Sequence, residues 1–142
     1  MHKSFIGCLL VLVGFIGFAQ VKPYDLKVEY LNNPEGVDAE EPRFFWKLTS
    51  NESGQFQRAY QLLVASSKEN LDKNIGDTFD SKKVNSSETI QIIYKGKSLV
   101  PASQYYWKVK VWDKDSTPTW SETATFSTGL FKTEDWKGAQ WI

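Results

Sequence analysis

The sequence has 142 residues, with 17 Lys and Arg against 17 Asp and Glu, and this length suits one domain with short extensions. The balanced charge predicts no electrostatic attraction to nucleic acid or to an anionic membrane. His2, Cys8 and Met1 are the only residues of their types, and all three precede residue 20. The chemistry open to the rest of the chain is therefore limited.

Residues 1–19 have the pattern of a signal peptide. A basic start that includes Lys3 leads into an almost wholly apolar run over residues 5–18, which is shorter than the roughly 20 residues of a membrane-spanning helix. Small residues at Gly17 and Ala19 predict cleavage between Ala19 and Gln20, with a retained anchor as the alternative. We therefore expect an exported protein, periplasmic or extracellular, whose mature chain makes no contact with the membrane.

Short segments with alternating apolar and polar residues follow, which is the pattern of half-buried strands. Turns rich in Asn, Gly, Ser and Pro separate them, and residues 67–74 have the pattern of a helical turn or a loop. The predicted strands are seven: residues 26–30, 44–48, 58–66, 78–81, 88–94, 105–111 and 123–128. This number and spacing predict an all-β fold, an antiparallel two-sheet sandwich.

The segment before the strand at 105–111 indicates which kind of sandwich this is. Leu99, Pro101 and Tyr105 form the pattern L-x-P-x-x-x-Y, typical of a tyrosine corner, in which the hydroxyl bonds the chain a few residues upstream. We therefore predict an immunoglobulin or fibronectin type III-like sandwich over residues 25–131. A signal peptide (1–19) and a short leader (20–24) precede it, and residues 132–142 begin a linker to a further domain.

The composition of the mature chain excludes several catalytic chemistries. Without histidine or cysteine there is no Ser-His-Asp or Cys-His nucleophile, no thiol redox pair and no ordinary zinc site. Paired carboxylates could still hydrolyse glycosides, but the acidic residues lie at positions expected to face solvent or to form turns. We interpret residues 113–116 as a hairpin loop and not as a calcium loop. The sequence thus assigns no catalytic residue, no metal site and no cofactor.

Aromatic residues make up 15% of the chain and divide into two groups. The inward register predicts a core that contains Tyr60, Trp46, Tyr105 and Trp107. Phe45, Tyr106 and Trp112 have the opposite register, and we expect them to contact a neighbouring domain, with a sugar platform as the alternative. Trp136 and Trp141, in the linker, are expected to make the same kind of interdomain contact.

Several segments, taken together and in order, resemble a known family. The sequence is similar to the N-terminal fibronectin-like domain of bacterial α-L-rhamnosidases, glycoside hydrolase family 78. The similar segments are residues 26–38, 42–48, 57–66, 105–113, 120–122, 126–130 and 135–142.

The resemblance implies that such a domain precedes further β-domains and an α-helical barrel. In that family the barrel hydrolyses terminal α-L-rhamnose with inversion, and none of its acidic residues has a counterpart here. We therefore expect a fragment that is inactive by itself, whose partners are the downstream domains of the same enzyme. The alternative is a free-standing exported module that binds a glycan or a protein.

Overall fold

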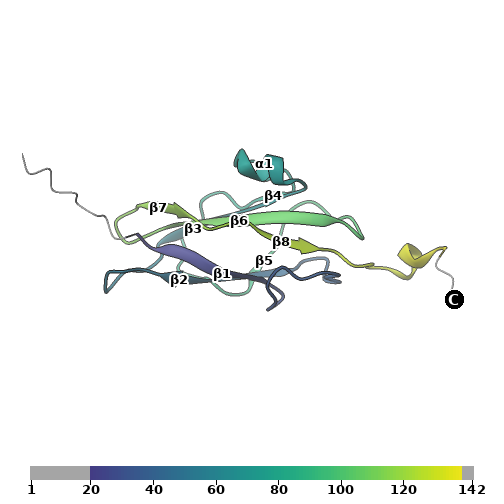
Figure 1. Ribbon diagram of the computed structural model, residues 1–142, viewed down its shortest axis with the longest axis horizontal. Helices are drawn as coiled ribbons and strands as arrows, with labels where there is room; N and C mark the ends of the chain where they lie inside the picture. The colour runs from purple at the N-terminus through teal and green to yellow at the C-terminus, as the bar shows by residue number, and fades with distance from the viewer. Residues whose placement is uncertain (1–19, 139–142) are drawn as a thin grey trace, which may run out of the picture.

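The computed structural model describes residues 20–138 and consists mainly of short strands (Figure 1). The elements are β1 (Lys22–Val28), β2 (Arg43–Thr49), β3 (Ala59–Ala65), α1 (Lys68–Asp72), β4 (Phe79–Asp80), β5 (Ile92–Ile93), β6 (Gln104–Trp112), β7 (Pro118–Trp120), β8 (Ala124–Ser127) and the 3₁₀ helix η1 (Thr133–Trp136). No helix within residues 20–138 is long and apolar enough to cross a membrane.

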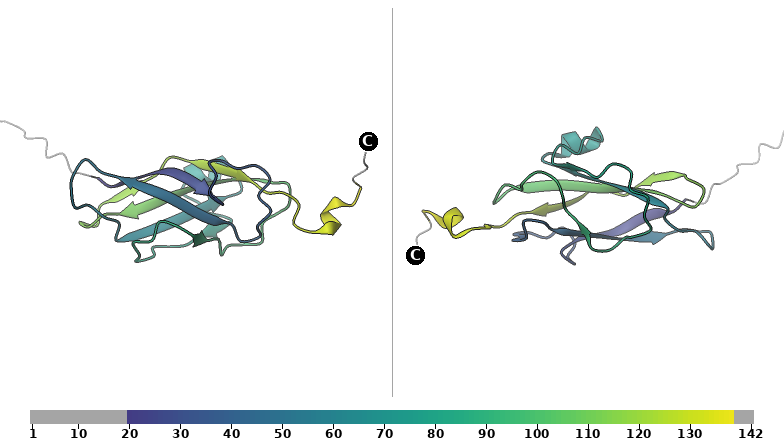
Figure 2. Two further views of the ribbon diagram at one scale, coloured as in Figure 1. Left: turned by 90° about the horizontal axis from the view of Figure 1, so that it is seen from below. Right: turned by 180° about the vertical axis from the view of Figure 1, so that it is seen from behind.

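The strands form two layers, which confirms the predicted sandwich. One sheet has three strands in the order β1-β2-β5, and the other has five, in which β4, β3, β6 and β7 are neighbours and β8 also pairs with β6. All pairs between these strands are antiparallel. Figures 1 and 2 show the sheets face to face, with α1 on the outer side of the five-stranded sheet and η1 beyond one end.

The strands differ from the prediction in number and in their limits. β1 begins at Lys22, within the predicted leader over residues 20–24. An eighth strand, β7, follows the hairpin loop after β6, and its three residues are too few to show alternation. β5 is limited to Ile92–Ile93, a small part of the strand predicted over residues 88–94. β1 ends at Val28 because Glu29 and Tyr30 both have positive φ, 49° and 69°, and form a tight turn.

The core lies between the sheets and uses the inward positions of the strands. The predicted core aromatics are all buried there, and Trp107 and Trp46 are 0% and 2% exposed. The Phe44 ring contacts Trp107 edge-to-face, with centroids 4.7 Å apart. Aromatic pairs of this geometry add to the free energy that burial supplies, so the sandwich can be stable without a disulfide.

One buried polar side chain connects the core to a loop. Gln57 is 1% exposed, and its Oε1 accepts a hydrogen bond of 3.0 Å from Trp46 Nε1. Its Nε2 donates to the carbonyl oxygens of Ser86 and Glu88, at 3.0 and 2.9 Å. A single amide thus satisfies the buried indole N–H of Trp46 on β2 and two partly buried carbonyl groups of the segment between β4 and β5.

The loop before β6 is held by a tyrosine hydroxyl. The Tyr105 hydroxyl accepts a hydrogen bond of 2.8 Å from the backbone N–H of Val100, while Leu99 is 7% exposed and packs in the core. Pro101, which lies in the turn between them, restricts the backbone there because its ring fixes φ.

Both faces of β3 are covered. Leu63 and Ala65 point away from the main core and form a second small cluster with Leu71 of α1. Ser67 caps α1 because its Oγ accepts the N–H of Asn70. The helix therefore covers one end of the outer face of the five-stranded sheet.

Ion pairs tie together strands of the three-stranded sheet. Asp25 Oδ2 lies 2.8 Å from Lys47 Nζ and 3.6 Å from Lys27 Nζ. The hydrogen bond from Lys47, together with one from Asn32, lowers the pKa of Asp25 from 3.8 to about 2. Asp25 lies in a bulge of β1, where the register with β2 shifts.

We expect Tyr105→Phe to lower the free energy of unfolding by about 1 kcal/mol, because it removes one hydrogen bond and leaves the Val100 N–H without its partner. Thermal unfolding should show a Tm lower by about 4 °C. Tyr24→Phe, at a residue that is 45% exposed, is the matched control and should leave the Tm within about 1 °C. Equal effects of the two variants would contradict the role of the corner.

We expect Gln57→Met to cost about 3 kcal/mol, because one buried and two partly buried polar groups lose their partner while the side-chain volume stays similar. Urea unfolding followed by tryptophan fluorescence measures this loss. Gln104→Met, at an exposed position, removes the same amide and should change the stability by less than about 0.5 kcal/mol. A loss below about 1 kcal/mol for Gln57→Met would show that the three partners find other donors or acceptors.

Stability should fall as the pH drops from about 4.5 towards 2. The pKa values of Asp25, Glu29, Asp77 and Asp80 are all lowered in the folded protein. Their contribution is therefore complete above the unfolded-state pKa and is lost as each carboxylate takes up a proton. Tm measured against pH should show this decline, and Asp25→Asn should make it less steep. Asp38→Asn, at an exposed carboxylate, should follow the unmodified protein.

Candidate functional site

Several of the carboxylates that the structure describes hold turns or form ion pairs. Asp80 Oδ1 accepts hydrogen bonds from Gln61 Nε2 and from the N–H of Lys82, and Asp80 Oδ2 pairs with Lys82 Nζ at 2.9 Å. Burial raises the pKa of Asp80, but these hydrogen bonds outweigh it and the pKa is lowered. A general acid needs the opposite shift. Residues 20–138 contain no group of three His, Cys, Asp or Glu side chains that could hold a metal ion.

Asp113 differs from the expectation that the acidic residues face solvent. It is 1% exposed, and its Oδ1 accepts the N–H groups of Asp115 and Thr117, both at 2.9 Å. The hairpin loop folds over the carboxylate because these two donors have no other partner in so tight a turn. Asp113 thus organises the β6–β7 hairpin.

The three aromatics expected to form an exposed contact surface do not lie together. Phe45 belongs to the three-stranded sheet, whereas Tyr106 and Trp112 belong to the outer face of the five-stranded sheet, on the opposite side of the sandwich (Figure 1). Phe45 is only 9% exposed, because the Tyr30 ring covers it with centroids 4.5 Å apart. The alternation along β2 correctly predicted that Phe45 points away from the core. It could not predict that Tyr30 folds back over the Phe45 ring.

Tyr30 is itself exposed on that side, at 53%. Glu29 and Tyr30 occupy the left-handed positions of a turn closed by hydrogen bonds between Val28 and Leu31, a conformation that costs a side-chain-bearing residue about 1–2 kcal/mol. Glu29 compensates by accepting Arg43 Nε and Nη2 at 3.1 and 2.8 Å. The hydrogen bond from Arg43 also lowers the pKa of Glu29.

The outer face of the five-stranded sheet carries alternating lysine and tryptophan side chains. Trp112 lies 4.7 Å from Lys83 Nζ and 5.1 Å from Lys110 Nζ, measured to the ring centroid. Trp120 lies 4.9 Å from Lys110 Nζ and 4.5 Å from Lys108 Nζ. We call these five residues the Lys–Trp row. Tyr106, at the other end of β6, packs against the cluster beneath α1.

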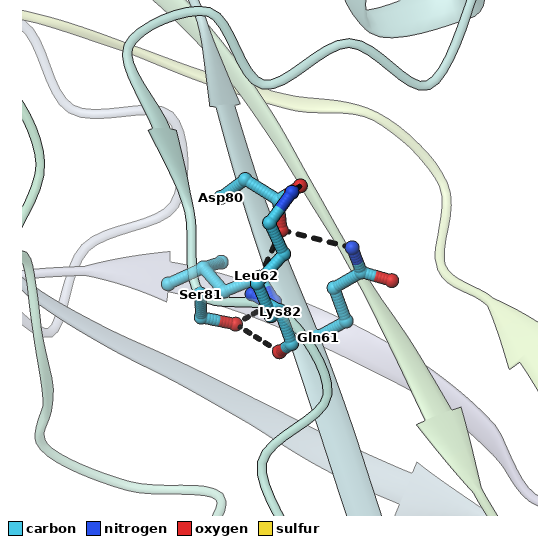
Figure 3. Close-up of polar contacts among 5 residues, drawn as sticks. All are labelled: Gln61, Leu62, Asp80, Ser81 and Lys82. Carbon is cyan, nitrogen blue, oxygen red and sulfur yellow. Dashed lines mark hydrogen bonds and ion pairs between the residues drawn. The ribbon is translucent and has the colours of Figure 1, made fainter.

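A polar turn after β4 positions the first lysine of the row. The backbone N–H of Leu62 donates to Ser81 Oγ at 2.8 Å, and the Ser81 hydroxyl donates to the carbonyl of Lys82 at 2.8 Å (Figure 3). The backbone of Val84 then pairs with Tyr60 of β3. Lys83 is held between these two attachments, beside the β3–β6 pair that contains Trp112.

A groove of about 860 Å³ lies at the end of the sandwich from which the chain leaves. Tyr94, Leu99, Pro101 and Phe131 line it, and Asp135 of η1 reaches it. Asp135 Oδ2 accepts the N–H groups of Phe131 and Lys132 and so fixes the start of η1. Trp136 on the same helix is 58% exposed.

Some predicted site residues lie outside the described part of the chain, and the sequence reasoning missed others. His2, Cys8, Ala19 and Trp141 lie outside residues 20–138, and Gln20 is exposed. The reasoning missed Tyr30 and the row members other than Trp112. The alternating pattern of β6 could have indicated Lys108 and Lys110, because both occupy outward positions on the same face as Trp112. No local pattern indicates Lys83, which comes from a distant segment.

A model of the Rha78A-like N-terminal immunoglobulin domain matches residues 23–132. Among curated proteins, an α-L-rhamnosidase of Formosa agariphila is 43% identical over 112 residues, 78% of this chain. An α-L-rhamnosidase of Streptomyces avermitilis is 40% identical over 116 residues, 81% of this chain. The matched region makes up only 12% and 11% of these relatives.

Solved structures agree with the sequence matches. The α-L-rhamnosidase of Dictyoglumus thermophilum superposes with a TM-score of 0.78 at 47% identity, over 81% of this chain and 13% of that one. The S. avermitilis enzyme, solved with L-rhamnose, superposes with a TM-score of 0.78 at 37% identity, over 83% of this chain and 11% of that one. The two-sheet sandwich, its length and these matches together show that the chain belongs to the Rha78A-like N-terminal immunoglobulin domain family of α-L-rhamnosidases.

Proposed function

We propose that this chain serves as a non-catalytic accessory domain of an exported α-L-rhamnosidase. The observation that carries the proposal is the ratio of lengths: the family model covers residues 23–132 of this chain, whereas the matched segments make up only 12% and 11% of the curated relatives. We assign the hydrolysis of terminal α-L-rhamnose to the remaining length of such an enzyme.

The use of the carboxylates supports a structural role. Glycoside hydrolysis needs two carboxyl groups that face a sugar, with one pKa raised. Here Asp25 and Glu29 form ion pairs, while Asp80, Asp113 and Asp135 accept backbone N–H groups. Each of these side chains is committed to holding the domain together.

The end of the sandwich near η1 is the surface that we assign to contact with other domains of the enzyme. The groove and the exposed Trp136 lie together there, and the chain leaves the sandwich at that end (Figure 1). An indole that is more than half exposed favours a partner, because burial of a tryptophan contributes strongly to interfaces. The proposal that the enzyme is exported rests on the signal-peptide pattern of residues 1–19.

The purified chain should release no p-nitrophenol from p-nitrophenyl α-L-rhamnoside, because we place the reacting groups on other domains. The matched positive control is the full-length F. agariphila relative under the same conditions. Turnover by this chain that survives repurification would show that it carries a catalytic site of its own.

A domain exchange tests the accessory role. Replacing the matched segment of the F. agariphila enzyme with residues 23–138 of this chain should give a folded, active enzyme. Deleting that segment should lower its Tm. Trp136→Ala in the exchanged enzyme should lower the Tm by several degrees, whereas Val100→Ala, at another exposed apolar residue, should not. An exchanged enzyme no more stable than the deletion would instead favour a free-standing module.

A further inference from the structure

The Lys–Trp row is built from three separate segments of the chain. Lys108, Lys110 and Trp112 occupy alternate outward positions of β6, and Trp120 of β7 lies directly opposite Lys110 in the register of the two strands. Lys83 approaches from the segment between β4 and β5. Sheet pairing therefore fixes the backbone positions of four of the five residues.

The lysines of the row form no ion pair within 4.0 Å with a carboxylate that the structure describes, although the charge of Asp72 acts on Lys108 from a greater distance. Among residues 20–138, the ion pairs within 4.0 Å involve other lysines and Arg43, and none includes Lys83, Lys108 or Lys110. Lys108 Nζ instead donates to the neutral Oδ1 of Asn74 at 2.6 Å. The ammonium groups therefore contact indole rings and an amide.

The environment of Lys108 favours the arrival of an anion. Burial lowers the pKa of Lys108, and the neighbouring charge of Lys110 lowers it further, while Asp72 acts in the opposite direction. Cation–π attraction at a partly exposed site is worth only about 0.5–1 kcal/mol per contact. A bound anion would offset the repulsion between the two ammonium groups, which the indole rings cannot fully do.

We propose that the Lys–Trp row binds an anionic polysaccharide. The ammonium groups of Lys83, Lys108 and Lys110 would pair with its carboxylate or sulfate groups, and the half-buried indoles would pack against the C–H groups of its sugar rings. A neutral sugar fits less well, because it offers no anion to draw the ammonium groups away from the rings of Trp112 and Trp120, over which they lie. The choice of a saccharide over an acidic protein rests on the proposed function, whereas the anion site itself does not.

The full chain can be tested against four polymers by isothermal titration and affinity electrophoresis. Polygalacturonate carries carboxylates, dextran sulfate carries sulfates, dextran is neutral, and polyglutamate is anionic without sugar rings. Either anionic polysaccharide, or both, should bind more tightly than dextran and polyglutamate, and the tighter of the two identifies the anion. Binding should weaken as salt is added, because surface charges are screened.

The double variant Lys108→Gln/Lys110→Gln should weaken this binding at least about tenfold, which corresponds to about 1.4 kcal/mol. Lys95→Gln/Lys97→Gln removes the same charge from exposed lysines outside the row and should weaken it less than about twofold. Lys110→Arg keeps the charge and should bind within about threefold of the unmodified chain. The Tm of each variant shows whether it folds. If the double variant is unstable, the affinity of Lys110→Arg and the salt dependence of binding still test the site.

Three results would overturn the proposal: no binding of either anionic polysaccharide, binding of polyglutamate with equal affinity, or equal losses in the two double variants. The second would indicate an acidic protein partner and the third a diffuse charge effect. Because this chain alone is titrated, the outcome is independent of the domain exchange. If the chain binds polygalacturonate but the exchanged enzyme is inactive, the anion site is supported and the accessory role is contradicted.

Discussion

The two-residue period of β6 is the constraint on which the rest of the molecule depends. This strand pairs with β3 along one edge and with β7 and β8 along the other, so it holds the five-stranded sheet together. Its inward residues, Trp107 among them, fill the core, and its outward residues Lys108, Lys110 and Trp112 form most of the Lys–Trp row. A shift of one residue in register would exchange these two sets.

Polar side chains hold the loops and turns, where the strands and their alternating pattern end. Gln57 holds a loop against the core, Asp113 organises a hairpin, and Asp80 fixes the turn after β4. These groups fit an accessory domain because their hydrogen-bonding capacity is directed at the backbone, and a carboxylate that stabilises a turn is not free to act on a substrate. The hydrogen bonds to Asp80 also make the stability of the domain depend on acidic pH, because they lower the pKa of this carboxyl group.

The distribution of charge matters more here than its sum. The formal net charge is zero, and this balance predicts no attraction to nucleic acid or to an anionic membrane. Ion pairs nevertheless neutralise lysines such as Lys47 on one sheet, while the lysines of the row on the other sheet contact indoles. A local field depends on which charges the fold brings together, and screening limits its reach to about 8–10 Å.

The sequence by itself determined the class of fold and the inward face of most strands, because alternation records which side of a strand is buried. It also indicated the segment around Tyr105 and the helical turn near Leu71. The tertiary structure decided what covers the outer faces. Tyr30 folds over Phe45 because its turn reverses the chain, and Lys83 reaches Trp112 because two attachments to β3 hold its segment. Contacts between residues far apart in sequence follow from strand pairing, and no local pattern records them.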